Sequence, residues 1–287
     1  MSLLRKGDTV GIVACSDGFN YDNKLVVDKL INQLNSFGLT VVCSDYIYIR
    51  ESVFSGTSQE KALALMNFYK DHNIKAIFDI SGGNLANGVL DYLDFDIIKN
   101  NYKPLFGYSD LTVLLNALYS KVGSKNYLYQ VRNLVDNYKE IQCNNFKDTF
   151  MEEKKSLLDF DYEWIQGTTM EGVIIGGNIR CLLKLSGTQY MPNFNNKILL
   201  LESYSGGVGE MTTFLTQYKQ QGAFKKVKGI ILGHFTQMQK ENYIPDIVEI
   251  VKDIVDDSTL PIVKTDYIGH GKDSKCAVIG ENVKLKK

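Results

Sequence analysis

A serine stands where a predicted strand gives way to a buried helix. Residues 103–112 read Lys-Pro-Leu-Phe-Gly-Tyr-Ser-Asp-Leu-Thr, and the apolar run 113–122 follows at once. A short strand, a tight turn with Ser109 at its corner and a helix are typical of a nucleophile elbow, which exposes a serine hydroxyl beside a helix N-terminus. Leu111 replaces the second glycine of Gly-x-Ser-x-Gly, so the motif is incomplete. A serine N-cap on an ordinary core helix is the alternative interpretation.

A nucleophilic serine needs a base, and the base needs a partner that fixes its tautomer. Three histidines are available. His72 lies at a predicted helix end, where an interaction with the helix dipole is its simpler role. His234 and His270 both follow predicted strands, and the glycines on both sides of His270 favour it only slightly. Glu202 closes the aliphatic strand 198–201 and is the preferred carboxylate, the alternative being a solvated residue that starts a loop.

Two glycine pairs follow predicted strands. Gly82 and Gly83 could present backbone N–H groups to an oxyanion, although a tight turn is the simpler interpretation. The run Gly-Gly-Asn at 176–178 has the same ambiguity. Neither pair belongs to a Gly-x-Gly-x-x-Gly motif or a P-loop, so no nucleotide cofactor is expected. The five cysteines are odd in number and include no Cys-x-x-Cys pair, so neither a metal site nor a disulfide framework is expected.

The elements that must position these residues alternate along the chain. Continuous apolar strands at 9–15, 39–43 and 76–80 are separated by helical patterns, which predicts an α/β fold with a parallel sheet. Sites in such sheets form beyond the carboxyl ends of the strands. We expect an N-terminal α/β domain at 1–150 with the elbow, and a C-terminal domain at 165–287 with the glutamate and histidine.

Two further segments, one around the boundary between these domains and one at the end of the second domain, carry predictions of their own. Polar residues dominate 123–164, which predicts a linker or surface excursion between the domains. The apolar stretches 275–279 and 283–285 predict a closing hairpin.

Composition excludes some classes of function. The 287 residues carry a net charge of −1 with lysines spread along the chain, which argues against binding a nucleic acid polymer. No apolar run approaches a membrane span, and the N-terminus lacks the pattern of a signal peptide. We therefore expect a cytoplasmic protein with reduced thiols and no membrane partner.

Five dispersed motifs, in order, resemble the LD-carboxypeptidase family of serine peptidases, including its muramoyltetrapeptide carboxypeptidase and microcin C immunity branches. The likeness also takes in 90–96 and 222–233, and so nearly the whole chain. The motifs are Gly82-Gly83, Gly-Tyr-Ser-Asp-Leu-Thr at 107–112, Val-Ile-Ile-Gly-Gly-Asn at 173–178, Ile-Leu-Leu-Leu-Glu at 198–202, and Gly269-His270.

The resemblance implies a fold and a mechanism. The fold would be an N-terminal flavodoxin-like domain and a C-terminal swivelling β/α domain, often in a homodimer. Ser109, Glu202 and His270 would form the triad, and the N–H groups of Gly83 and Asp110 would bind the oxyanion. The enzyme would be a serine-type carboxypeptidase that needs no cofactor. Its substrate would be a muropeptide of peptidoglycan recycling or an aminoacyl-nucleotide.

The chain also departs from the family pattern. Peptidoglycan-recycling members have an arginine before the glycine pair and a tyrosine and glycine after it, where this chain has Ser81, Asn84 and Leu85. Family members usually have a Gly-Pro pair after the elbow helix. This chain lacks it, and residues 129–131 stand near its place. Residues 81–84 and 90–96 look more like the microcin immunity branch.

Substrate-binding roles follow from residue type and place. Gly82, Asn84 and Arg180 are candidate substrate-binding residues, and we expect a cation such as Arg180 or Arg132 to hold an anionic group of the substrate. The competing functions are an α/β serine esterase of another family and a non-catalytic binding protein on the same fold.

Overall fold

The first sheet takes five strands from the first part of the chain and one from its C-terminal part. The computed structural model describes residues 2–287, and its first six-stranded sheet has the order β11-β5-β4-β3-β1-β2. All neighbours run parallel except β11, which is antiparallel to β5. The strands are β1 (Thr9–Val13), β2 (Thr40–Cys43), β3 (Ile74–Asp79), β4 (Leu105–Gly107), β5 (Asn126–Leu128) and β11 (Ala277–Ile279).

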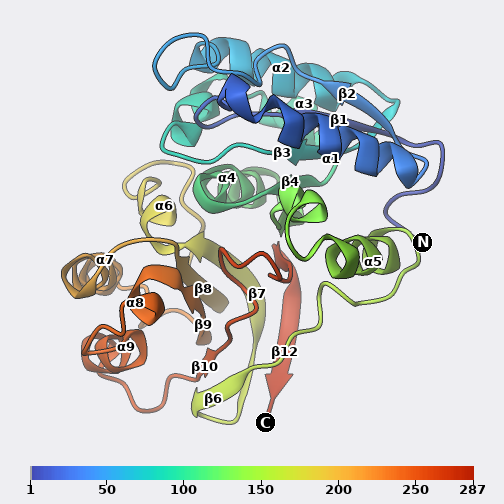
Figure 1. Cartoon of the computed structure of the whole chain (residues 1–287). Helices are drawn as coiled ribbons and strands as arrows, with labels where there is room; N and C mark the ends of the chain where they lie inside the picture. The colour runs from blue at the N-terminus through green and yellow to red at the C-terminus, as the bar shows by residue number, and fades with distance from the viewer. Residues whose placement is uncertain (1) are drawn as a thin grey trace.

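Helices cover both faces of this sheet (Figure 1). Side chains of α1 and α5 belong to one core cluster, and those of α2, α3 and α4 belong to a second that continues into the rest of the molecule. The helices are α1 (Lys24–Ser36), α2 (Ser58–Lys70), α3 (Phe95–Asn100), α4 (Thr112–Val122) and α5 (Lys139–Phe150). Short 3₁₀ helices are η1 (Tyr21–Asn23), η2 (Ala86–Tyr92), η3 (Ser109–Leu111) and η4 (Val131–Val135).

The second unit is built on another six-stranded sheet with the order β12-β7-β8-β9-β10-β6. The four central strands run parallel, and β12 and β6 close the two edges antiparallel. The strands are β6 (Glu163–Gln166), β7 (Thr169–Asn178), β8 (Lys197–Ser203), β9 (Gly229–Phe235), β10 (Ile262–Lys264) and β12 (Asn282–Lys286). The helices are α6 (Ile179–Leu183), α7 (Val208–Gln220), α8 (Thr236–Lys240) and α9 (Ile247–Val255).

Local sequence signals are confirmed where they were clearest. The α/β class is confirmed. Thr57 and Glu60 form a capping box at the start of α2. The elbow helix α4 ends at Gly123, whose φ of 71° is the left-handed conformation that glycine adopts easily. Helix α4 is apolar nearly all round because it packs between the first sheet and the second unit, against β7 and α6.

No helix among residues 2–287 is long and apolar enough to span a membrane.

The predicted closing hairpin is wrong. Strand β11 joins the first sheet beside β5, whereas β12 joins the second sheet beside β7. Each of the two strands lies at an edge of its sheet, but all three residues of β11 are buried, whereas β12 alternates between exposed and half-buried positions. Residues 277–279 therefore add to the sheet of the first unit. The domain boundaries 1–150 and 165–287 stay a prediction.

The predicted linker at 123–164 is also wrong for most of its length. It contains β5, η4 and α5, and the side chains of Phe146 and Phe150 on α5 are buried in the core of the first unit. Phe150 packs edge-on against Phe106 of β4, with ring centroids 5.0 Å apart. Two aromatic residues one helical turn apart are enough to dock α5, although polar residues outnumber apolar ones along it.

Candidate active site

Ser109 occupies a strained corner between a strand and a helix. Tyr108 is extended, with φ −146° and ψ 165°, and Ser109 then turns to φ 55°, a region that residues other than glycine rarely adopt. Helix α4 follows after one 3₁₀ turn. Gly107 lacks a Cβ because that atom would lie 2.6 Å from Cβ of Leu111. Leu111, which stands in place of the motif's second glycine, therefore packs onto the turn. This strained turn has the backbone geometry expected of a nucleophile elbow, and the N-cap of the 3₁₀ turn is Tyr108 and not Ser109.

A glutamate and a histidine are hydrogen-bonded at the end of the second sheet. His270 Nδ1 lies 2.8 Å from Glu202 Oε2, and the hydroxyl of Tyr108 donates to the same oxygen at 3.1 Å. Glu202 is fully buried, so the alternative of a solvated loop residue is wrong. The ladder between β8 and β9 shifts register between Leu201 and Ser203, and such an irregularity re-aims the side chain within it.

Tyr108 is a functional candidate that sequence reasoning missed. Its hydroxyl is buried, and burial together with the neighbouring Glu202 raises the pKa of this phenol well above its usual value. The hydroxyl therefore stays protonated and able to donate at neutral pH. The only sequence signal for this role is the position of Tyr108 directly before Ser109.

The two other histidines lie in different surroundings. His234 Nδ1 is 2.9 Å from the hydroxyl of Thr236, and burial lowers the pKa of the His234 imidazole. Gly269 has no room for a Cβ, which would lie 2.4 Å from Cβ of His234, so the loop that carries His270 packs closely onto β9. His72 is exposed beyond the end of α2. Of the three, His270 is the one hydrogen-bonded to a buried carboxylate.

A cavity of 240 Å³ places Ser109 opposite residues of the second unit. Gly83, Asn84 and Ser109 line it from the first unit, and Arg180 and Tyr204 are among the lining residues of the second. The ring of Tyr204 lies 4.9 Å from that of His270, and the ring of Tyr108 lies 4.8 Å from it on centroid distances. His270 is thus held between the neighbour of Ser109 and a wall of this cavity. Residues 2–287 include no hydrogen bond between the Ser109 hydroxyl and His270.

The loop after β3 brings a backbone donor to the same cavity. Gly83 has a φ of 122°, and a Cβ there would lie 2.1 Å from the carboxylate carbon of Asp17, so only glycine fits. Gly82 has open space around it and no such requirement. The N–H of Asn84 donates to Asp17 Oδ1 at 2.8 Å. Within the described part of the chain, the Gly83 N–H has no protein acceptor.

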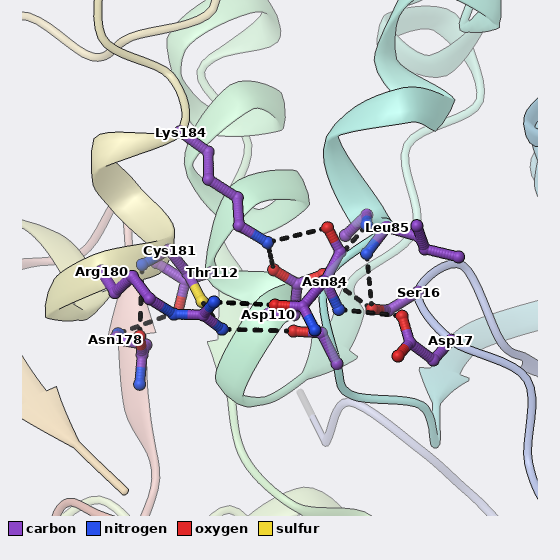
Figure 2. A network of polar contacts seen from close by, with 12 residues as sticks. Ser16, Asp17, Asn84, Leu85, Asp110, Thr112, Asn178, Arg180, Cys181 and Lys184 are labelled. Atoms are coloured by element: carbon purple, nitrogen blue, oxygen red, sulfur yellow. Dashed lines mark hydrogen bonds and ion pairs between the residues drawn. The ribbon is translucent and has the colours of Figure 1, made fainter. Parts of the chain in front are cut away.

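Two cations, Arg180 on α6 and Lys184 at its C-terminal cap, reach across to this loop (Figure 2). Arg180 is exposed and donates to Asn84 Oδ1 at 2.7 Å and to the Gly83 carbonyl at 3.4 Å. Lys184 donates to the Asn84 carbonyl at 2.9 Å and forms an ion pair with Asp110. Sequence reasoning named Arg180 but missed Lys184. The one available signal was the spacing of four residues, which places both side chains on one face of a helix.

The Gly-Gly-Asn run at the end of β7 docks the elbow helix. The side-chain amide of Asn116 on α4 donates to the Gly176 carbonyl and accepts from the Gly176 N–H, both at 2.8 Å. A Cβ on Gly177 would lie 2.6 Å from Oγ1 of Thr112, at the first residue of α4. Gly177 is therefore required by the close approach of α4 to β7, whereas a Cβ on Gly176 would lie 2.1 Å from the Leu200 carbonyl oxygen on β8. Asn178 caps α6 by accepting from the Cys181 N–H.

The thiols do not compete with Ser109 as nucleophiles near this cavity. Burial, with a smaller contribution from Asp110, raises the pKa of Cys181 to about 12. Burial also raises the pKa of the Cys15 and Cys276 thiols well above the usual value. A thiol that stays protonated at neutral pH is a poor nucleophile.

Residues 2–287 contain no group of three or more His, Cys, Asp or Glu side chains placed to hold a metal ion.

Comparisons with known proteins match both units. The model of the LD-carboxypeptidase N-terminal domain matches residues 10–130, and that of the C-terminal domain matches 171–285. The microcin C7 self-immunity protein MccF of Escherichia coli is 23% identical over 91% of this chain and 85% of its own length.

Solved structures extend the likeness to the fold. The MccF-like protein of Bacillus anthracis is 28% identical, with a TM-score of 0.86 over 99% of this chain and 95% of that one. The muramoyltetrapeptide carboxypeptidase of Oxalobacter formigenes is 22% identical, with a TM-score of 0.79 over 97% of this chain and 95% of that one. MccF has been solved with glutamyl sulfamoyl guanosine and with aspartyl sulfamoyl adenosine. The predicted two-unit fold is confirmed, and because the two domain models together span most of the sequence, the chain belongs to the LD-carboxypeptidase family.

Proposed function

We propose that this protein is a serine peptidase that hydrolyses an amide bond through an acyl-enzyme. The observation that carries the proposal is the fully buried Glu202 bonded to His270, beside a cavity whose opposite wall holds Ser109 in an elbow turn. A buried carboxylate on Nδ1 of a histidine fixes the ring in the tautomer whose Nε2 can accept a proton. The peptidase activity itself is supported by membership of the family.

The proposed mechanism assigns a role to each of these residues. Ser109 Oγ attacks the carbonyl carbon while its proton moves to His270 Nε2, and Glu202 stabilises the imidazolium that forms. The N–H groups of Gly83 and Asp110 stabilise the oxyanion of the tetrahedral intermediate. His270 then gives its proton to the leaving amine, and water attacks the acyl-enzyme by the same route in reverse.

The cavity favours an anionic group on the substrate. Among the described residues that line it, Arg180 is the only charged one. A guanidinium can hold a carboxylate or phosphate-like group through two parallel hydrogen bonds. Both substrate classes of the family satisfy this requirement, the terminal D-amino acid of a muropeptide through its carboxylate and an aminoacyl-nucleotide through its phosphate or sulfamoyl group. Gly82 and Asn84 would contribute backbone and amide contacts.

The first test asks whether Ser109 is an activated nucleophile. A fluorophosphonate probe forms a bond between Ser109 Oγ and phosphorus, fluoride leaves, and the serine proton passes to His270. We expect a single labelled site at Ser109 that Ser109→Ala removes. Labelling elsewhere, or none on folded protein, would contradict the proposal and favour a non-catalytic binding protein.

The second test identifies the substrate class. The enzyme is incubated with a muropeptide mixture and with aspartyl and glutamyl sulfamoyl nucleosides, and the products are followed by mass spectrometry. Release of an amino acid from one set, absent with Ser109→Ala, assigns the class. Fast turnover of short nitrophenyl esters with neither set cleaved would favour the esterase alternative. The homodimer and the cytoplasmic location stay predictions.

A further inference from the structure

The residue after the nucleophile carries a carboxylate at the centre of a buried network. Asp110 is fully buried. Its Oδ2 accepts from the Ser16 hydroxyl at 2.6 Å and from the Ala86 N–H at 2.9 Å, and its Oδ1 pairs with the ammonium of Lys184. Figure 2 shows this carboxylate between the loop after β3 and the helix α6. The elbow, the glycine loop and the second unit therefore meet at one side chain.

The same network fixes the loop that carries Gly83. Asn84 donates its N–H to Asp17 and receives the Lys184 ammonium on its carbonyl. The N–H of Leu85 points to the Ser16 hydroxyl at 3.3 Å. The N–H and carbonyl of Asn84 and the N–H of Leu85 are thus bonded to the protein, while the Gly83 N–H has no acceptor within residues 2–287. The contacts hold this N–H in place without using it.

The charge of Lys184 also matters for the oxyanion. The Asp110 carboxylate belongs to the same residue as one of the two proposed oxyanion donors, and a buried negative charge there would oppose a second negative charge in the transition state. The side chain of Lys184 is only 18% exposed, so solvent screens its pairing with Asp110 weakly. Removing one partner of a buried pair leaves an uncompensated charge. Lys184 is not among the residues that line the cavity with Ser109.

We propose that Lys184, which belongs to the second unit, is a positioning residue that holds the two oxyanion donors of the first unit in place. It neutralises the Asp110 carboxylate and holds the Gly83–Asn84 loop through the Asn84 carbonyl. The role rests on the proposed function, because it concerns an oxyanion formed at Ser109. Lys184 acts through Asp110 and the loop, and so affects the transition state more than binding of the ground state.

The test uses fluorophosphonate labelling of the whole protein, which needs no known substrate and yields kinact and KI separately. Lys184→Met should lower kinact about 100-fold, the size of losing one oxyanion donor, and change KI less than about threefold. Lys184→Gln keeps a hydrogen-bond donor without the charge and serves if the Met variant does not fold. Lys184→Arg should retain activity within about tenfold of wild type.

A charge-balanced double variant separates electrostatic positioning from general damage. Adding Asp110→Asn to Lys184→Met removes the uncompensated carboxylate and should restore kinact at least about tenfold over Lys184→Met alone. Lys121→Met is the matched control, because Lys121 on α4 also bridges the units, to Gln189 at 2.9 Å, and is exposed. It should label like wild type.

The outcomes distinguish the two proposals. A kinact for Lys184→Met within threefold of wild type, or a double variant no better than the single one, overturns the role of Lys184. A wild-type protein that is not labelled, or whose labelling survives Ser109→Ala, overturns the proposed function, and the positioning role falls with it.

Discussion

Glu202→Gln is the change that tests the proposed triad most directly. Glu202 Oε2 accepts from His270 Nδ1 and from Tyr108, whereas its buried Oε1 has no hydrogen-bond partner within residues 2–287. Glutamine keeps the shape but must place its NH₂ group at one of these two positions. Facing His270, the NH₂ forces the proton onto Nε2, which then cannot accept the serine proton. At the Oε1 position, the NH₂ is a buried donor without an acceptor.

Either arrangement has a cost that can be approximated. A charged hydrogen bond contributes about 1.5–3 kcal/mol and a neutral one about 0.5–1.5 kcal/mol, and an unsatisfied buried donor costs about 1–3 kcal/mol. Exchanging the charged bond for a neutral one loses about 1–1.5 kcal/mol, and with the unsatisfied donor the total is about 2–4.5 kcal/mol. At about 1.4 kcal/mol for each factor of ten, Glu202→Gln should lower the rate by about 30- to 1500-fold. Losing the negative charge that faces the imidazolium should lower the rate more than it weakens substrate binding.

The assay measures kinact for labelling by the fluorophosphonate, and it measures kcat once a substrate is identified. Tyr108→Phe is the graded control, because it removes one donor at 3.1 Å and leaves the His270 contact intact. It should lower the rate only about tenfold. A Glu202→Gln enzyme within tenfold of wild type, or a Tyr108→Phe enzyme as slow as Glu202→Gln, would refute the reasoning. Circular dichroism must show that both variants fold.

Four further results are expected. His270→Ala should lower the rate about 10⁴-fold while His234→Ala keeps most activity, and the reverse order would show that the base is wrongly assigned. Because residue 109 has a φ of 55°, Ser109→Gly should be about 0.5–1 kcal/mol more stable than Ser109→Ala in urea unfolding; a more stable alanine variant would contradict the strained turn. A peptide ending in free D-alanine should have a higher kcat/KM than its C-terminal amide, and Arg180→Met should remove the difference; equal values in the wild type would exclude the anion contact. Iodoacetamide at pH 7.5 should leave the activity intact because the pKa of Cys181 is raised to about 12, whereas inactivation would implicate a thiol.

The elbow and the alternating elements could be predicted because their signals are local. A strand, a turn and a helix at 105–122 lie within one stretch of chain, and the apolar run of α4 shows burial directly. Glu202 at the end of an aliphatic strand was recognisable for the same reason. The choice between His234 and His270 was not local, since both follow strands beside glycines. Only the packing of the loop after β10 brings one of them onto Glu202.

The remaining features depend on contacts between distant segments. Whether β11 pairs with β12 or with β5 is decided by the arrangement of two sheets, which the residues of β11 do not encode locally. The sequence does not distinguish Lys184 from the other lysines, because its role depends on the packing of α6 against the loop that carries Gly83. The burial of Asp110 likewise follows from three elements that are far apart in sequence. Long-range placement, and not residue type, gives these side chains their roles.

The candidate site is a property of the docked units and not of either one alone. The first unit supplies Ser109 and Gly83, and the second supplies Glu202, His270 and Lys184. A serine at a φ of 55° carries strain of about 1–3 kcal/mol, which persists only where the surroundings hold it. The paired hydrogen bonds between Asn116 on α4 and Gly176 on β7 lock the helix that follows the turn. The contacts that dock the two units are therefore also those that keep Ser109 in its strained position.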